Sequence, residues 1–420
     1  MTLIKTSFLS AIAVMIKMIT LLSLNKILAI YVGPSGYAAL GQFQNAIQMI
    51  TTLASGAINT GVTKYTAEYH KDEIKQRAVW RTAGTISSLG SVLMAVGIII
   101  FNKPLALWFL KDDGLGNVFI WFAITLILFV FNTLLLAILN GKKEIRRFVI
   151  ANISGSLFAL AVTSLMAIIM GLYGALIAVA IYPSLAFFVT ALLCYRARWF
   201  RFEYLFGGVD KDAVKKLSKF TAMAATSAVC LPVSHILVRN YLGENLGWEA
   251  AGYWEAMWRL SAAYLLLVTT TLGVYYLPRL SELQDSEIIK QEIVGGYKII
   301  LPAAAASGLA IYLMRESIIR TLFTADFAAM EVLFGWQMIG DTMKIGSWIL
   351  AYLMLSKAMT KLFILSEIAA AISFYLLTIF LTDNYGLEGV AMAHSINYVL
   401  YWLLMACFIG NKIFSKSNAR

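Results

Sequence analysis

Long apolar runs recur along the whole chain, and most can cross a membrane as a helix, which takes about 20 residues at ~1.5 Å each. None of these runs alternates between apolar and polar residues with a period of two, as the strands of a membrane barrel would. Hydrophobic residues make up 60% of the chain and charged residues only 14%. The sequence therefore predicts an all-α, polytopic membrane protein and argues against a soluble globular fold.

The interruptions between the apolar runs have the composition of turns, as in Gly33-Pro34-Ser35-Gly36. The first run is too long for the core of a signal peptide, and we interpret it as an uncleaved helix. Only segment 196–217 is long, basic and poor in apolar periodicity, which indicates a cytoplasmic linker between an N-lobe, 1–195, and a C-lobe, 218–420. Twelve transmembrane helices, six in each lobe, are expected at 6–31, 37–62, 82–101, 116–139, 148–170, 174–194, 218–238, 250–276, 296–314, 330–354, 362–381 and 387–410.

Lysine and arginine are distributed unevenly between the two sets of loops. The termini and the loops on their side hold most of them, whereas the opposite loops carry only Lys103, Lys111, Arg315 and Arg320. Because cytoplasmic loops are enriched in basic residues, both termini are expected in the cytoplasm. This asymmetry explains most of the formal net charge of +11 without a nucleic-acid partner.

One sequence pattern occurs twice, half the chain apart. GYAALGQFQNAI (Gly36–Ile47) corresponds to GWEAAGYWEAMW (Gly247–Trp258), and a shorter match pairs Tyr173-Gly174 with Tyr385-Gly386. Two lobes with the same topology are related by a pseudo-twofold axis along the membrane normal, which places a cavity between them and permits alternating access by rocking. A duplicated fold without a central cavity is the alternative.

Ionisable side chains inside the predicted helices mark candidate functional sites, because each costs about 2.5–3.5 kcal/mol at the centre of a span. Helix spacing places Glu255 with Arg259, and Asp341 with Lys344, on shared faces, where they could simply neutralise each other. Arg239 lies near the outer end of its span and could extend to the membrane surface. The full set comprises Lys17, Lys26, Arg239, Arg259, Lys344, Glu255, Asp341, Glu367, His235 and His394.

Lys17 differs from the other candidates because it lies near the middle of the first span, and the first six spans contain no acid to pair with it. Lys26 falls on the opposite side of a straight helix. An unpaired cation in a membrane needs water or an anionic partner. The second span adds a cluster of amides that suits a wet lumen better than a lipid-facing surface: Gln42, Gln44, Asn45, Gln48 and Asn59.

Aromatic residues within the repeated stretches allow two interpretations. Phe43, Trp254 and Trp258 could stack on sugar rings, or they could belong to an interfacial aromatic belt. The cysteines have no metal-ligand spacing. The sequence contains no nucleotide-binding loop, metalloprotease motif or serine-hydrolase elbow, so it predicts no cofactor, no metal site and no catalytic residue.

Four stretches resemble the Wzx-type flippases of the multidrug/oligosaccharidyl-lipid/polysaccharide exporter superfamily. They are Gly33-Pro34-Ser35-Gly36, G-V-T-K-Y (Gly61–Tyr65), K-F-T-A-M-A (Lys219–Ala224) and W-Q-M-I-G-D-T-M-K (Trp336–Lys344). The resemblance covers essentially the whole chain and is strongest to the branch that serves enterobacterial common antigen synthesis.

This resemblance implies twelve helices in two lobes around a central cationic cavity. It also implies a substrate, an oligosaccharide on undecaprenyl diphosphate that moves from the cytoplasmic to the periplasmic leaflet of the bacterial inner membrane. The glycan is that of lipid III or an O-antigen repeat unit. The other expected partners are membrane lipids, with polysaccharide polymerase and chain-length proteins as candidates.

A lipid diphosphate carries negative charge through hydrocarbon, and unpaired cations along a wet lumen lower that barrier. Lys17, Arg259 and Lys344 are expected to contact the diphosphate, and Lys64 to capture it at the cytoplasmic mouth. Lys26 and Arg239 complete the candidate substrate-binding set. The candidates for ion pairing, or for coupling to a proton or sodium gradient, are Glu255, Asp341, Glu367 and His235.

Two other functions are compatible with these features. A cation-coupled multidrug exporter of the same superfamily needs a buried carboxylate that alternately binds a cation, and only Glu367 lacks a basic neighbour in the sequence. A membrane-embedded polymerase or acyltransferase usually needs a sizeable external loop, and the outward loops here are short. The sequence therefore predicts a transporter and not an enzyme.

Overall fold

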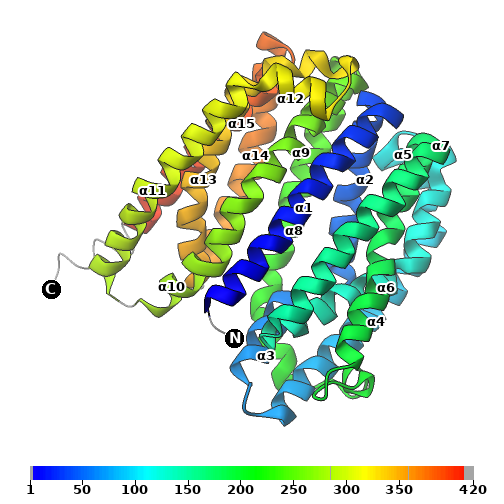
Figure 1. Cartoon of the computed structure of the whole chain (residues 1–420), viewed down its shortest axis with the longest axis vertical. Coiled ribbons are helices and arrows are strands. Elements are labelled where there is room, and N and C mark those ends of the chain that lie inside the picture. Colours follow the sequence, from blue (N-terminus) through cyan, green and yellow to red (C-terminus); the bar gives the residue numbers. More distant parts are fainter. Residues whose placement is uncertain (1–2, 284, 358, 411–420) are drawn as a thin grey trace. The chain divides into compact units, whose positions relative to one another are not determined.

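A computed structural model of the chain describes residues 3–283, 285–357 and 359–410. Every regular element in these ranges is helical, which confirms the all-α prediction (Figure 1). The contacts divide the chain into unit 1, made of Met1–Val32 and Ala39–Pro232, and unit 2, made of Gly33–Ala38 and Val233–Arg420. The expected division into lobes at 1–195 and 218–420 remains a prediction.

Unit 1 is built around α6 (Gly116–Gly141) and α7 (Ile145–Tyr195), which pack along each other. The first helix, α1, lies against α7, and α4 lies against α6. Helix α6 lies at the centre of this packing because its apolar side chains avoid water there: Leu126, Leu134 and Ile138 are fully buried. The other helices that contribute to unit 1 are α1 (Leu3–Tyr31), α2 (Gly33–Ala54), α3 (Asn59–Glu68), α4 (Glu73–Ile100), α5 (Asn102–Leu110) and the first part of α8 (Lys211–Asn245).

Several helix ends follow directly from the sequence. The Oδ1 atom of Asp72 accepts a hydrogen bond from the backbone amide of Lys75 at 3.1 Å and caps α4. This hydrogen bond holds the pKa of the exposed Asp72 carboxyl below its usual range. Asp285 caps α11 in the same way, through the amide of Glu287 at 2.8 Å. Pro34 lies in the first turn of α2, where its missing amide hydrogen is not needed.

The expected span 37–62 is wrong toward its C-terminal end. Helix α2 ends at Ala54, and α3 begins only at Asn59. Gly56 and Ala57 lie between them with φ values of 68° and 53°, which a right-handed helix cannot accommodate. The apolar character of the sequence continues across this break, so hydropathy alone could not locate it.

The basic segment 196–217 packs onto unit 1 rather than extending from it. It contains a short 3-10 turn, Phe202–Leu205, and the beginning of α8. Phe200, Leu205 and Leu217 are buried in the main hydrophobic cluster of unit 1. The Leu205 backbone approaches Gly84 of α4 so closely that a side chain at Gly84 would overlap it.

Unit 2 is centred on α13 (Phe334–Ser356), which packs against α11 and α15, while α15 packs against α14. The first turn of α2 also belongs to this unit, because the Tyr37 ring lies 5.1 Å from that of Phe327. Helix α9 continues into a π-helical turn, Leu272–Tyr276, within the expected span 250–276. The remaining helices are α9 (Trp248–Thr271), α10 (Leu277–Glu282), α11 (Ser286–Leu313), α12 (Arg315–Leu322), α14 (Thr360–Tyr385) and α15 (Glu388–Ile409).

A shared backbone turn supports the sequence repeat and corrects one of its matches. Gly171 interrupts α7 with φ 58° and ψ −136°, and Gly386 separates α14 from α15 with φ 59° and ψ −142°. Three residues later, Gly174 and Gly389 each pack against a backbone carbonyl of the preceding helix. The corresponding stretches are therefore G-L-Y-G and G-L-E-G, and the pairing of Tyr173-Gly174 with Tyr385-Gly386 is wrong.

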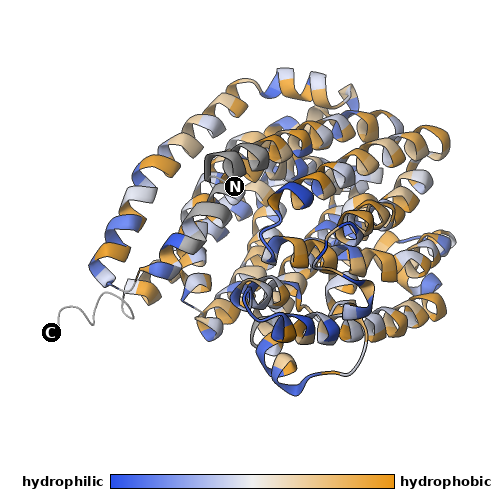
Figure 2. Ribbon diagram, turned by 60° about the horizontal axis from the view of Figure 1, so that its bottom comes forward, coloured by the Kyte–Doolittle hydropathy of each residue, from blue (hydrophilic) through white to orange (hydrophobic). Residues whose placement is uncertain are grey.

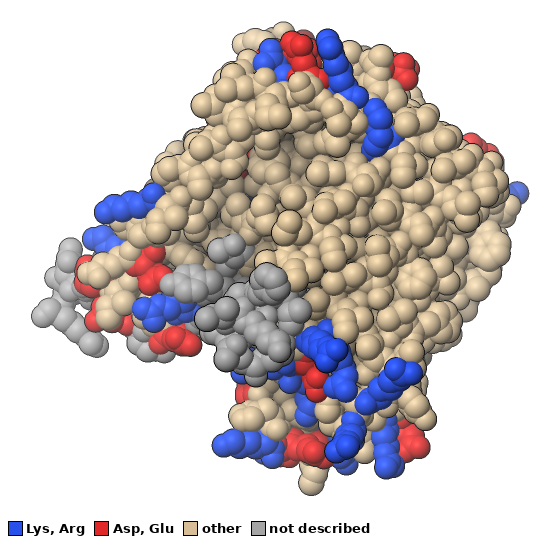
Figure 3. Space-filling model, in the orientation of Figure 1, with Lys and Arg blue, Asp and Glu red and all other residues tan. Residues whose placement is uncertain are grey.

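Eight helices of the described part are long and apolar enough to cross a membrane, and one of them, α7, covers two of the expected spans. Apolar residues dominate most of the ribbon (Figure 2). The charged side chains gather near the ends of the helices and leave a broad uncharged area on the face in Figure 3. Helices α2, α9 and α13 are not among the eight; they contain the amides and charges that the sequence singles out.

Gly174→Ala and Gly389→Ala are expected to lower the thermal midpoint of the purified protein. The added Cβ would overlap the carbonyl of Met166 or of Leu381, and overpacking of this kind costs about 1–3 kcal/mol. Gly97→Ala is the control, because nothing lies within 4 Å of its new Cβ, and the midpoint should stay or rise. Equal midpoints for all three variants would contradict the close packing at both turns.

Candidate functional site

Three charged side chains form a buried ion network in unit 2. Oε2 of Glu255, on α9, accepts hydrogen bonds from Nη2 and Nε of Arg239, on α8, at 2.6 and 3.0 Å. Oε1 of Glu255 accepts one from Nε of Arg259, one turn further along α9, at 2.8 Å. Arg239 and Glu255 are only 2% and 3% exposed. The carboxylate is thus held between two guanidinium groups, and the network has an excess of positive charge.

Aromatic faces cover both guanidinium groups of this network. Arg239 lies 5.4 Å from the ring centroid of Trp254, and Arg259 lies 5.3 Å from that of Tyr37. The ion pair between Glu255 and Arg259 that helix spacing predicts is present. The expectation that Arg239 extends to the membrane surface is wrong, because Glu255 on the neighbouring helix holds it inside.

Asp341, on α13, is fully buried and is stabilised by hydrogen bonds from three helices. Its Oδ2 accepts hydrogen bonds from the hydroxyls of Ser261 and Tyr264, both on α9, at 2.5 and 2.6 Å. Its Oδ1 lies 3.0 Å from Nε2 of His394, on α15, and 3.3 Å from Nε2 of Gln337. Hydroxyl, amide and imidazole donors therefore replace water around this carboxylate.

Lys344 does not form the expected ion pair with Asp341, although the two are one helical turn apart. Its Nζ lies 4.0 Å from the ring centroid of Trp258, 5.1 Å from that of Trp348 and 5.3 Å from that of Tyr398. Within the described part of the chain no carboxylate pairs with it, and the residue is 6% exposed. Lys344 is therefore a buried cation that aromatic faces stabilise.

Trp258 connects these groups. Its ring lies 4.2 Å from that of His235 and 5.5 Å from that of His394, and Lys344 lies over its face. His235 is buried, and its Nε2 has no hydrogen-bond partner among the described residues. The structure thus brings His235 and Lys344 of the predicted set together through Trp258.

Glu367, on α14, takes part directly in neither of the two carboxylate networks around Glu255 and Asp341. Its Oε1 accepts a hydrogen bond from the hydroxyl of Tyr401 at 2.9 Å. No basic side chain forms an ion pair with it in the ranges that the structure describes. The structure therefore agrees with the sequence that Glu367 is a carboxylate without a basic partner.

The predicted basic residues of α1 belong to unit 1. Lys17 is exposed near the middle of a predominantly apolar helix, and it makes no hydrogen bond or ion pair with another described residue. Lys26 is half-buried and has an interaction partner, and its neighbour Asn25 is buried. Lys17 is thus available to a ligand or to water.

Lys64 lies in a cluster of lysines and tyrosines at α3. Its Nζ lies 5.3 Å from the ring centroid of Tyr65, whose ring stacks on Tyr69 at 5.9 Å. Lys216, in the first turns of α8, donates a hydrogen bond to the hydroxyl of Tyr69 at 2.6 Å, and this bond raises the pKa of Lys216. The cluster places cationic groups on aromatic faces at one end of unit 1.

Amides of the second predicted span line a cavity of about 320 Å³ in unit 1. Two buried atoms of its lining residues, Oγ1 of Thr51 and Oδ1 of Asn59, have no hydrogen-bond partner within the described ranges. Of the five amides that the sequence singles out, Gln44, Gln48 and Asn59 line this cavity, whereas Gln42 and Asn45 do not, and the predicted central lumen stays a prediction. The lining of the cavity also includes Ser55, Thr133 and Tyr182.

Both interpretations of the aromatic residues in the repeated stretches are wrong for Phe43 and Trp254. Each is fully buried, and Phe43 packs against Phe119 with ring centroids 5.2 Å apart. Neither residue can stack on a sugar or lie at a membrane surface. Trp258 is half-buried and contacts Lys344 instead.

Sequence reasoning missed the residues that stabilise Asp341. Ser261 and Tyr264 lie on another helix and belong to no distinctive motif, and Gln337 lies within the Trp336–Lys344 stretch but is not among the candidate residues. A usable signal was present, because Gln337 and Asp341 are one turn apart and Ser261 and Tyr264 share a helix face. Which helix these faces meet depends on the fold.

Solved structures place this arrangement of helices in a known class of fold. A multidrug resistance MATE family transporter of the MOP superfamily, in its inward-facing conformation, superposes with a TM-score of 0.75 at 14% identity, covering 94% of this chain and 95% of that one. The lipid II flippase MurJ, inward closed, gives a TM-score of 0.71 at 14% identity, covering 97% and 87%. The fold is that of a helical membrane transporter.

Sequence comparisons identify the family. The family model described as polysaccharide biosynthesis protein matches residues 3–284, and the chain belongs to this family. Its relatives include the lipid III flippases of Escherichia coli (strain K12) and Shigella flexneri, each 31% identical over 407 residues, covering 96% of this chain and 97% of the relative. The resemblance found in the sequence is thereby confirmed.

Glu255→Gln is expected to reduce the yield and the thermal midpoint of folded protein strongly. Removing the carboxylate takes the anionic partner from two buried guanidinium groups, and breaking a buried pair costs about 3–5 kcal/mol. Glu249→Gln, at the exposed start of the same helix, is the matched control for the change of charge. Both quantities can be measured by size-exclusion chromatography in detergent, and equal losses in the two variants would contradict a structural role for the network.

Proposed function

We propose that this protein is a flippase that moves an oligosaccharide linked to undecaprenyl diphosphate between membrane leaflets by alternating access. The observation that supports this most strongly is the 31% identity over 96% of the chain to two lipid III flippases. The membership of the polysaccharide biosynthesis family agrees with it. The cargo is lipid III itself or a related lipid-linked unit such as an O-antigen repeat.

The proposed setting is the bacterial inner membrane, with both termini in the cytoplasm and transport toward the periplasmic leaflet. The loop asymmetry of lysine and arginine supports this orientation. Polysaccharide polymerase and chain-length proteins are the proposed protein partners, because they act on the glycan after it has crossed.

The cavity of unit 1 is the proposed contact for the glycan. Sugar hydroxyls both donate and accept hydrogen bonds, and the amides and hydroxyls around this cavity offer both without a formal charge. The unpartnered Thr51 and Asn59 oxygens support this role, because a buried polar atom gains most from a ligand that pairs with it.

Lysines without a carboxylate partner are the proposed contacts for the diphosphate. Lys17 is exposed on α1, and Lys344 is held by aromatic rings rather than by an acid. Arg259 adds positive charge beside a carboxylate that it shares with Arg239. Lys64 and the neighbouring lysine–tyrosine cluster are the proposed site of first capture.

Transport against a gradient needs a driving force, which we propose to be a proton or sodium gradient. Glu367 is the proposed coupling residue, because within the described residues its carboxylate is bonded only by the Tyr401 hydroxyl. The ion network at Glu255 is a less suitable coupling site, since two guanidinium groups already neutralise that carboxylate. An imposed pH or sodium gradient across proteoliposomes should change the rate of transport, and Glu367→Gln should remove that dependence.

The multidrug exporter remains the alternative in the same superfamily. Its support is the likeness to MATE structures, and at 14% identity this likeness concerns the fold alone. The full-length relatives are flippases, which favours the lipid-linked cargo.

Lys17→Ala is expected to abolish glycan export while the protein still reaches the membrane at normal levels. An exposed ammonium on a predominantly apolar helix contributes little to folding, whereas a diphosphate that crosses hydrocarbon needs the positive charge of this ammonium. When Lys17→Ala is the only copy expressed in a strain whose own gene is deleted, lipid-linked intermediates should accumulate. Lys111→Ala, an exposed loop lysine, should restore export, and undiminished export by Lys17→Ala would remove Lys17 from the mechanism.

Thr51→Val is expected to slow transport about fivefold, the effect of losing one hydrogen bond worth ~1 kcal/mol, without lowering the thermal midpoint. The Thr51 hydroxyl has no partner within the described chain, so its loss breaks no bond inside the protein. Ser87→Ala is the control, because Ser87 has an unpartnered buried hydroxyl outside the cavity. Equal transport rates for wild type and Thr51→Val would argue against a glycan contact here.

A further inference from the structure

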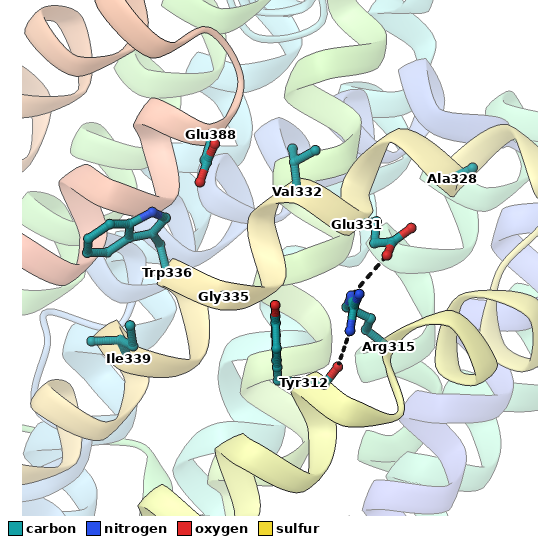
Figure 4. A pocket seen from close by; sticks show the side chains of 9 residues that line it. All are labelled: Tyr312, Arg315, Ala328, Glu331, Val332, Gly335, Trp336, Ile339 and Glu388. Atoms are coloured by element: carbon teal, nitrogen blue, oxygen red, sulfur yellow. Dashed lines mark hydrogen bonds and ion pairs between the residues drawn. The ribbon is translucent and has the colours of Figure 1, made fainter.

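A pocket of about 500 Å³ opens at one end of unit 2, where α11 ends and α12, α13 and α15 begin. Figure 4 shows Tyr312, Arg315, Glu331, Trp336 and Glu388 around it, from five different helical elements. Its volume lies within the range of small-molecule sites, about 300–1,000 Å³. None of the functional residues described above lines it.

The residues that line this pocket include more acidic than basic side chains. Nε of Arg315 lies 2.9 Å from Oε1 of Glu331, and its Nη1 donates a hydrogen bond to the Tyr312 carbonyl at 3.2 Å. Glu388 faces the same space, and its carboxylate forms no hydrogen bond or ion pair with a described residue (Figure 4). Because Glu331 balances Arg315, Glu388 gives the pocket a net negative charge.

A second cavity of about 500 Å³ is adjacent to the first, because Tyr312, Gly335 and Ile339 line both. It lies between α11 and α13, and on each helix its lining residues recur every three or four positions, so one face of each helix forms a wall. The groove extends for about two turns, or ~10 Å. Its other lining residues are mostly apolar: Ala305, Gly308, Leu309, Met338, Thr342 and Met343.

We propose that the two adjacent cavities bind one membrane phospholipid whose head group carries a primary ammonium. An acyl chain occupies the groove between α11 and α13, and the head group enters the pocket. The ammonium donates hydrogen bonds to the Glu388 carboxylate, and the phosphate accepts them from the remaining guanidinium donors of Arg315. Tyr312 lines both cavities and lies between these charges and the groove, where aromatic side chains contact the glycerol region, and Trp336 lines the head-group pocket.

The charge of the pocket selects against other amphiphiles. A lipid diphosphate or an anionic phospholipid would bring further negative charge to Glu331 and Glu388. A choline head group has no hydrogen to donate to Glu388. The proposal does not depend on the flippase function, because it concerns a lipid that binds at a different place from the proposed cargo contacts.

Native mass spectrometry of the purified full-length protein tests the proposal. The protein is offered equal amounts of phosphatidylethanolamine, phosphatidylcholine and phosphatidylglycerol, and the retained lipid is identified. Wild type should retain phosphatidylethanolamine, and Glu388→Gln should bind it about tenfold more weakly, the effect of losing a charge-assisted hydrogen bond. Glu316→Gln, an exposed acid on α12, is the matched control and should bind like wild type.

A thermal melt separates binding from folding. Glu388→Gln should melt like wild type without lipid, because the carboxylate has no partner in the described chain to lose. Added phosphatidylethanolamine should raise the midpoint of wild type and of Glu316→Gln, but not that of Glu388→Gln. Equal retention of the three lipids, preference for the anionic lipid, or unchanged binding by Glu388→Gln would each overturn the proposal.

Discussion

Burial of charge without water is the constraint that arranges unit 2. Three ionisable residues in its helices satisfy this constraint in different ways. Glu255 is neutralised by two guanidinium groups, Asp341 is solvated by hydroxyl, amide and imidazole donors, and Lys344 faces aromatic rings. Each arrangement replaces hydration with fixed partners from a different helix, so the polar groups specify which helices lie together.

These contacts also link the helices mechanically. Asp341 on α13 is bonded to α9 through Ser261 and to α15 through His394. Separating these helices would leave a buried carboxylate with Gln337, on its own helix, as its one remaining donor among those described, which costs several kcal/mol. The helices of unit 2 are therefore expected to move together during transport, and a gating motion within this unit would have to exchange these bonds for others.

The sequence predicts contacts within one helix better than contacts between helices. The Glu255–Arg259 pair follows from spacing along α9, whereas the hydrogen bonds from Arg239 depend on how α8 packs against α9. Spacing also allows an ion pair between Asp341 and Lys344, but the carboxylate oxygens of Asp341 bond to donors from α9 and α15 instead. Likewise, the apolar runs predict the helices but not the break between α2 and α3. This break depends on the backbone conformation at Gly56, which does not change the hydropathy of the sequence.

The repeat shows which features the fold requires and which it leaves open to function. Both halves keep a glycine turn with nearly the same positive φ, at Gly171 and Gly386, which a residue with a side chain adopts only with strain. Three residues later, Gly174 and Gly389 pack too closely against the preceding helix for a side chain. The polar residues that follow the repeated glycines of α2 and α9 differ instead: neutral amides line a cavity in the first copy, and Glu255 with Arg259 forms an ion network in the second. A diphosphate needs cations and a glycan needs neutral hydrogen-bonding groups, so this difference supports the proposal that the two copies contact different parts of one amphiphilic cargo.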